Sequence, residues 1–74
     1  MKARARIPVM DAERVARDPE FREWLIKRAE DAINDMAQKD GRKISSRPEF
    51  VDVHESRLTP AVVYFDFEAD TVPA

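Results

Sequence analysis

The 74-residue chain has no cysteine, a single histidine (His54) and a single glycine (Gly41). Disulfides are therefore excluded, and a structural metal site built from histidine and cysteine has too few ligands. A chain this short buries only about 60% of the surface that its unfolded form exposes, and small domains usually gain the missing stability from disulfides, a metal or a partner. We therefore expect a partner, and specifically oligomerisation, to contribute to the stability of the fold.

Long hydrophobic runs are also missing. No apolar run approaches the roughly 18 residues that a membrane span needs, and residues 1–8 are basic without the apolar region of a signal peptide. The lack of cysteine is compatible with a reducing compartment. These features predict a soluble protein that is made inside the cell and has no contact with a membrane.

Residues suited to catalysis are scarce. His54 lies next to Glu55 and near Asp52 in the sequence, as a base and its orienting carboxylate would, but no nucleophile, second histidine or glycine-rich loop accompanies it. Asp66 and Glu68 share one face of a predicted strand, whereas hard cations need more oxygen ligands on tighter loops. We predict that the protein is not an enzyme and binds no cofactor, metal or small-molecule substrate, and that His54 is a polar strand residue.

The charge of the chain is nearly balanced, with 13 basic and 15 acidic residues and a pI near 5.3. This balance argues against a dedicated nucleic-acid binder that acts by neutralising phosphates. Cations gather at the start of the chain and acids at its end: Lys2, Arg4 and Arg6, and Asp66, Glu68 and Asp70. Two interpretations remain open, namely two solvated termini, or a basic arm that meets the acidic strand of a neighbouring copy.

Two helices are predicted after this arm, which covers residues 1–10 and is either an edge strand or a disordered lead. Asp11 can cap a short helical turn. Asp18 is a strong cap for a second helix, because the proline that follows it occupies the first helical position, where its missing N–H is harmless. Gly41 provides a conventional stop, so the long helix is predicted over residues 18–40.

The long helix is amphipathic. Its apolar stripe follows three- and four-residue spacing and contains Phe21, Leu25, Ala29, Ala32, Ile33 and Met36. Trp24 and Ile26 lie along the two borders of this stripe. Either the stripe packs on the sheet of its own chain, or it is too wide for a small sheet and places Trp24 or Ile26 against a second subunit.

Two strands are predicted after a connector over residues 41–48, which is rich in turn-forming residues. Residues 50–54 and 61–68 both alternate between apolar and polar side chains, which is typical of an antiparallel hairpin. An isolated hairpin is marginal in water, so its apolar face should cover the helix. The prediction is an α+β fold with one small domain over residues 11–74, a hairpin over about 50–68 and a C-terminal tail over 69–74.

The order of these segments resembles the neck and tail-completion proteins of long-tailed bacteriophages. The resemblance is carried by residues 18–33 (DPEFREWLIKRAEDAI), 50–54 (FVDVH) and 57–64 (RLTPAVVY). Members of that group often have a short helix, then a long helix rich in alanine and charge, then a β-hairpin or small sheet. This chain is shorter than usual for them and lacks the glycine-containing segment that many carry between the helix and the strands.

The resemblance implies a structural virion protein, made in the host cytoplasm, that forms part of a ring between the DNA-filled head and the tail without catalysis. Its partners would be further copies of the chain, other connector or tail proteins and, passively, channel DNA. The residues expected at the subunit interface are Lys2, Arg4, Arg6, Trp24, Arg57, Val62, Tyr64, Asp66 and Glu68. The alternative is a small regulatory module that binds protein or DNA, such as an antitoxin-like or accessory factor.

Overall fold

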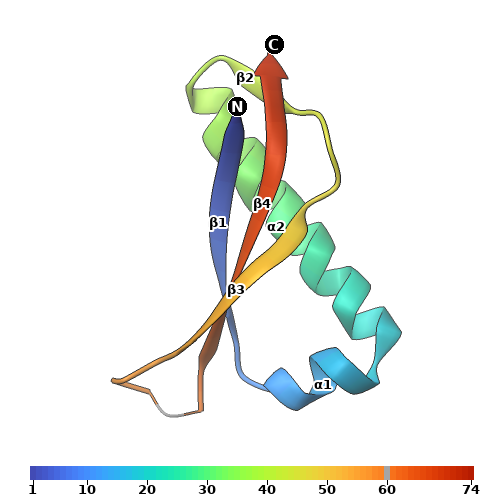
Figure 1. Ribbon diagram of the computed structural model, residues 1–74, viewed down its shortest axis with the longest axis vertical. Coiled ribbons are helices and arrows are strands. Elements are labelled where there is room, and N and C mark those ends of the chain that lie inside the picture. The colour runs from blue at the N-terminus through green and yellow to red at the C-terminus, as the bar shows by residue number, and fades with distance from the viewer. Residues whose placement is uncertain (60) are drawn as a thin grey trace.

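The computed structural model of the protein describes residues 1–59 and 61–74. A long helix packs on an antiparallel sheet of four strands, with a short helix at one end (Figure 1). The α+β fold expected from the sequence is confirmed. The elements in chain order are β1 (Lys2–Val9), α1 (Ala12–Arg17), α2 (Pro19–Lys39), β2 (Arg42–Ile44), β3 (Glu49–Glu55) and β4 (Val63–Pro73).

The centre of the sheet is β4, which pairs antiparallel with each of the other three strands. Along one side it pairs with β1, from Lys2 opposite Asp70 to Val9 opposite Val63. Along its other side, the first part of β4 pairs with β3 and the last part pairs with β2 (Figure 1). Consequently β1 and β3 lie at opposite edges of the sheet.

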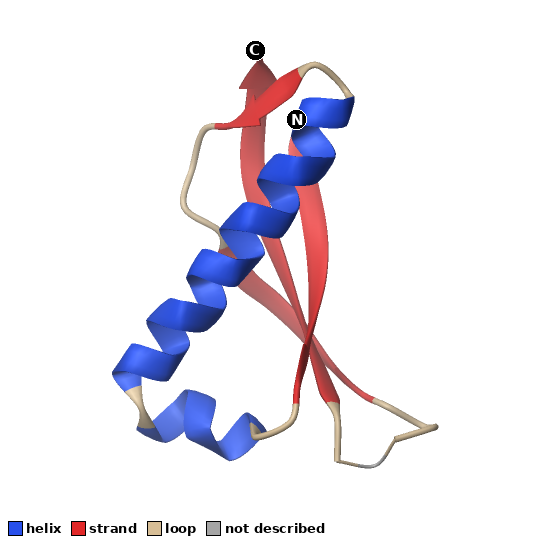
Figure 2. Ribbon diagram, turned by 180° about the vertical axis from the view of Figure 1, so that it is seen from behind, coloured by secondary structure: helices blue, strands red, loops and turns tan. Residues whose placement is uncertain are grey.

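Figure 2 shows α2 lying across one face of this sheet. The core lies between that face and the helix. Alternate residues of β1 and β4 point toward the helix because side chains in a strand alternate between its two faces. The buried apolar residues that form the core are Ala5, Ile7, Val9, Leu25, Ala29, Ile33, Phe65, Phe67 and Ala69. We call this side of the sheet the inner face and the opposite side the outer face.

The helix boundaries follow the predicted local signals. The Asp18 carboxylate accepts hydrogen bonds from the N–H groups of Glu20, at 3.0 Å, and Phe21, at 3.2 Å. The bond from Phe21, then a hydrogen bond from the Arg14 side chain at 3.1 Å, and then the bond from Glu20 lower the pKa of the Asp18 carboxyl. Gly41 ends the helix with a φ of +69°, in the left-handed region that favours glycine.

Replacing Asp18 with alanine should lower the thermal midpoint by roughly 4–8 °C, because two N–H groups at the start of α2 lose their acceptor. The matched control is Asp31→Ala, which removes an exposed carboxylate within the same helix. Thermal unfolding followed by circular dichroism would measure both. Equal midpoints for the two variants would contradict the capping role of Asp18.

The apolar stripe of α2 is displaced slightly from its predicted position. Leu25, Ala29 and Ile33 are buried as expected, and the fourth buried residue is Ala37, whereas Met36 is 41% exposed. Ala37 continues the four-residue spacing from Leu25 to Ile33, so the buried line is a straight ridge along the helix.

The first ten residues adopt one of their two predicted conformations, the edge strand. Their cations face the acidic residues of β4 in the same chain, in the pairs Lys2 with Asp70, Arg4 with Glu68 and Arg6 with Asp66. The expectation that the basic arm meets the acidic strand of a neighbouring copy is therefore wrong for this strand. The physical reason is that β1 supplies half of the apolar inner face, so leaving it free would expose Ile7 and Val9.

Two further expectations are corrected by the structure. The predicted connector over 41–48 contains β2, and Pro48 within it is buried. The predicted tail over 69–74 belongs largely to β4, in which Thr71 is buried and donates its backbone N–H to the Met1 carbonyl at 2.8 Å. Pro60, which directly precedes the second predicted strand, lies outside the described residues. No helix within the described part of the chain is long and apolar enough to cross a membrane.

Candidate functional site: an apolar groove and a charged sheet face

The outer face of the sheet carries a network of charged groups centred on Asp66, which is only 1% exposed. Arg6 of β1 donates from Nε to Asp66 Oδ1 at 2.9 Å and from Nη2 to Oδ2 at 3.3 Å. His54 of β3 places its Nε2 2.8 Å from Asp66 Oδ2. The network therefore ties both edge strands to the central strand.

The pKa of the Asp66 carboxyl lies below its usual value. The main cause is the hydrogen bond from Arg6, and the hydrogen bond with His54 acts in the same direction, whereas burial of the carboxyl opposes both. Asp66 is thus a buried carboxylate that stays ionised because its neighbours stabilise the charge.

Asp52, His54 and Asp66 also form a group of possible metal ligands, since one ligand atom from each lies within 4.8 Å of the others. Two carboxylates and an imidazole suit a divalent transition ion. However, Arg6 already bonds both oxygens of Asp66, and its positive charge opposes the binding of a cation at the same carboxylate. We therefore assign the group a structural role, in which His54 is a strand residue that links β3 to β4.

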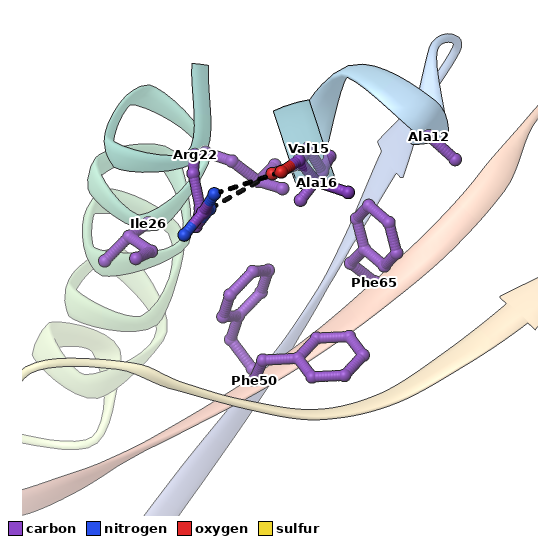
Figure 3. A pocket seen from close by; sticks show the side chains of 9 residues that line it. Ala12, Val15, Ala16, Arg22, Ile26, Phe50 and Phe65 are labelled. Carbon is purple, nitrogen blue, oxygen red and sulfur yellow. Dashed lines mark hydrogen bonds between the residues drawn. The ribbon is translucent and has the colours of Figure 1, made fainter. Parts of the chain in front are cut away.

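An apolar groove lies on the other face, between the two helices and the inner side of β3 and β4. Its volume is about 550 Å³. Figure 3 shows Phe50 from β3 and Phe65 from β4 directed into it. The lining residues are Ala12, Val15, Ala16, Arg22, Leu25, Ile26, Phe50, Phe65 and Phe67.

The groove exists because α2 crosses β1, β2 and β4 and leaves β3 uncovered (Figure 2). Phe50 packs edge-on against Phe65 and Phe67, with ring centroids 5.6 and 6.1 Å apart. Even so, Phe50 remains 56% exposed and its strand neighbour Val53 remains 48% exposed. Two large apolar side chains of the inner face are thus left in contact with water.

One wall of the groove is fixed by Arg22. Its guanidinium donates to the carbonyl oxygens of Val15, at 3.0 Å, and Ala16, at 3.3 Å, as the dashed lines in Figure 3 mark. These carbonyls lie near the C-terminal end of α1, where helical carbonyls lack partners within the helix. The bonds hold α1 against the start of α2, so the groove is a formed feature of the fold.

The residues predicted for a subunit interface are scattered in the structure. Trp24 is exposed on α2 and stacks on Phe21, with ring centroids 5.5 Å apart. Arg57 is exposed in the loop between β3 and β4, and Val62 in the same loop is half-buried. These three residues lie on different parts of the surface from the outer-face charges.

The remaining predicted interface residues lie on the outer face. Tyr64 is half-buried there, with the Arg6 guanidinium 5.9 Å from its ring centroid. Arg4 pairs with the half-buried Glu68 at 3.3 Å. Asp66 is buried by its neighbours, which excludes it from direct contact with a partner.

The groove was missed by sequence reasoning, although a signal for it exists. Phe50, Val51 and Val53 add three apolar side chains in the first predicted strand, and one helical stripe is too narrow to cover them together with the second strand. Comparison with protein-family models, with curated proteins and with solved structures finds no match to this chain.

Proposed function

We propose that the protein is a structural assembly component that works through contacts between protein surfaces. The phage resemblance suggests a specific setting, as part of a ring at the head-to-tail junction of a virion, in a neck, head-closure or tail-completion role. Partners of this kind would be copies of the same chain and other connector or tail proteins. Catalysis has no part in this proposal.

The observation that carries the proposal is the uncovered inner face of β3. Phe50 and Val53 are about half exposed beside a groove that is lined mainly by apolar side chains. Exposed apolar surface of this kind is typical of sites that bind another protein. A domain this small also gains stability when a partner covers such surface.

Contacts with protein are favoured over contacts with DNA. Lys2, Arg4 and Arg6 are the natural DNA-contacting residues of the chain, but each lies opposite an acidic residue of β4. Cations that are neutralised in this way release fewer counterions when they meet a phosphate backbone. Channel DNA is therefore at most a secondary partner in this proposal.

Light scattering coupled to size-exclusion chromatography would test the proposal across a range of protein concentrations. We expect the average mass to rise above that of one chain as concentration increases. Phe50→Gln should reduce this association at least about tenfold, the equivalent of 1.4 kcal/mol, because it places a polar group in the apolar contact. Leu58→Gln is the control, since Leu58 is 96% exposed in the loop and lies outside the groove.

A strict monomer at every concentration would contradict self-assembly and favour the alternative, a small regulatory module whose groove binds a segment of another protein. Measuring binding to random duplex DNA at low and moderate salt tests whether the regulatory module of that alternative is a DNA-binding one. A DNA-binding module would show affinity that falls steeply with salt, whereas the assembly protein should show almost none.

A further inference from the structure

We infer that the two edges of the sheet are complementary, and that β1 of a second copy of this chain adds to the open edge of β3 as a parallel strand. This inference rests on the proposed function and names its contact surface. It assigns the uncovered inner face of β3 to a neighbouring copy, in a head-to-tail arrangement in which every subunit uses two different edges.

The directions of the strands permit this arrangement. Both β1 and β3 run antiparallel to β4, so they run parallel to each other on opposite edges. A second copy displaced across the sheet therefore brings its β1 beside β3 with the same direction and with its inner face on the same side. Head-to-tail contacts of this kind close into rings or continue as open filaments.

The charges of the two edges select this pairing. Strand β3 carries Glu49, Asp52 and Glu55, and its Glu49 and Asp52 lie opposite Glu68 and Asp66 of β4. Like charges directly opposite one another across strands are destabilising. A basic strand on the free side of β3 would offset this repulsion. Strand β1 carries no acid, and it offers Lys2, which has no ion pair among residues 1–59 and 61–74, beside Arg4 and Arg6, whose half-exposed guanidinium groups already bond Glu68 and Asp66.

The same charges oppose symmetric pairing. Two β3 edges would bring together two acidic strands, and two β1 edges would bring together two basic strands. Only the mixed contact places unlike charges next to each other. The charge pattern thus favours a contact between different edges over a twofold dimer.

The apolar residues point to the same contact. Val53 pairs with Phe65 and Phe50 with Phe67, so both exposed side chains lie on the inner face. Strand β1 presents Ala3, Ala5 and Ile7 on this face, and α2 packs against it. A neighbouring copy would therefore bring its own helix to the side of the sheet on which Phe50 and Val53 are uncovered.

Features of both strands limit the length of the contact. A bulge between Phe50 and Asp52 interrupts the ladder of β3, and Asp52 Oδ1 accepts from the Val53 N–H at 2.8 Å. Pro8 has no N–H to donate, and proline is confined to strand edges and bulges for that reason. Regular pairing is thus expected between residues 52–55 and a segment within residues 2–7 of the neighbour. Because the two strands are parallel, Glu49 and the neighbour's Lys2 then lie at the same end of this contact.

A charge swap tests the inference. Lys2 and Glu49 are exposed, and neither takes part in an ion pair within residues 1–59 and 61–74. Lys2→Glu alone and Glu49→Lys alone should each weaken association about tenfold at low salt, since each replaces attraction by repulsion. The double variant should recover most of the loss, because the unlike charges are restored in the opposite sense.

Matched controls come from α1, where Arg17→Glu and Glu13→Lys make the same changes in net charge at exposed positions away from both edges. They should leave association within about twofold of the unmodified protein. Sedimentation velocity at several concentrations would measure all variants, and circular dichroism would confirm that each is folded.

Cross-linking identifies the strands in contact, because the chain has no cysteine of its own. A Val53→Cys variant is oxidised alone and mixed with variants that carry one cysteine at each position from 2 to 7, which includes Ile7, the residue at the same level of the sheet as Val53. Covalent dimers should form mainly in one or two of the mixtures, since a disulfide requires Cα atoms within about 7 Å. Efficient dimers of Val53→Cys alone would indicate a symmetric contact and overturn the inference.

The outcomes separate this inference from the proposed function. If association is unchanged by both charge reversals, or if the cross-links join other strands, the edge pairing is overturned. The protein would then be an assembly protein that uses another surface. A strict monomer at every concentration would overturn both. Association with the predicted swap and mixed cross-links would support both.

Discussion

Replacing Ile33 with alanine is expected to lower the free energy of unfolding by about 2–5 kcal/mol, a large part of the total stability of a domain this small. Ile33 is completely buried in the C-terminal half of α2, where it packs into the core against the sheet. Loss of an isoleucine at such a site costs about 2–5 kcal/mol, because the removed atoms lose their contacts and leave a cavity. A domain of this size has a total stability of only about 4–11 kcal/mol.

The matched control is Met36→Ala on the same helix. Met36 is 41% exposed, so its truncation should cost less than about 1 kcal/mol. Urea unfolding followed by circular dichroism and tryptophan fluorescence would measure both variants. Similar unfolding midpoints for the two would contradict the assignment of the core.

Asp66→Asn is expected to have the second largest effect, about 1.5–3 kcal/mol of destabilisation. Asparagine has nearly the same shape, but its neutral amide replaces the charged acceptor that Arg6 and His54 share. The amide NH2 group also places two donors next to the guanidinium of Arg6, which is itself a donor. One of the two oxygen acceptors of Asp66 is therefore lost to its neighbours. Glu68→Gln is the control on the same strand and face, and its half-exposed pair with Arg4 should contribute little.

The lowered pKa of Asp66 predicts that the destabilisation caused by Asp66→Asn depends on pH. The folded protein holds the pKa of Asp66 below its unfolded value, which is near 3.9 for an aspartate. The stabilisation is therefore fully present above about pH 5 and is lost as the pH falls through about 4 and then through the folded pKa. The difference in unfolding free energy between the unmodified protein and Asp66→Asn should shrink in this range. A difference that stays constant down to pH 3 would contradict the assigned charge state.

The helices could be predicted from the sequence because their signals are local. Asp18, the proline that follows it and Gly41 mark the ends of α2 within the sequence itself, and the apolar spacing marks its buried side. The hairpin of β3 and β4 is local in the same sense. Each of these predictions needs only residues that lie close together along the chain.

The other two strands depend on distant partners. The alternation of β1 fits both a free arm and an edge strand, and its partner lies about sixty residues away in β4. Strand β2 has only three residues and exists because the extended end of β4 is available to pair with it. Short strands of this kind have no periodic pattern of their own, so the sequence favoured a connector.

The candidate site was harder to predict from the sequence than the strands. The groove depends on the angle at which α2 crosses the sheet, which leaves Phe50 and Val53 uncovered. The burial of Asp66 depends on Arg6 and His54 reaching it from two different strands. Both features arise from packing between elements. The surplus of apolar residues in the first predicted strand indicates uncovered surface, but no local signal places the groove or the buried carboxylate.

Amide hydrogen exchange of β1 and β3, measured at low and high protein concentration, tests the central claim most directly. In dilute protein the outward N–H groups of both edge strands should exchange faster than those of β4, because edge groups lack a partner strand. At high concentration the account predicts slower exchange in β1 and β3 together, with the innermost amides of β4 little changed. Exchange in β1 and β3 that does not respond to concentration, in a protein that associates, would contradict it.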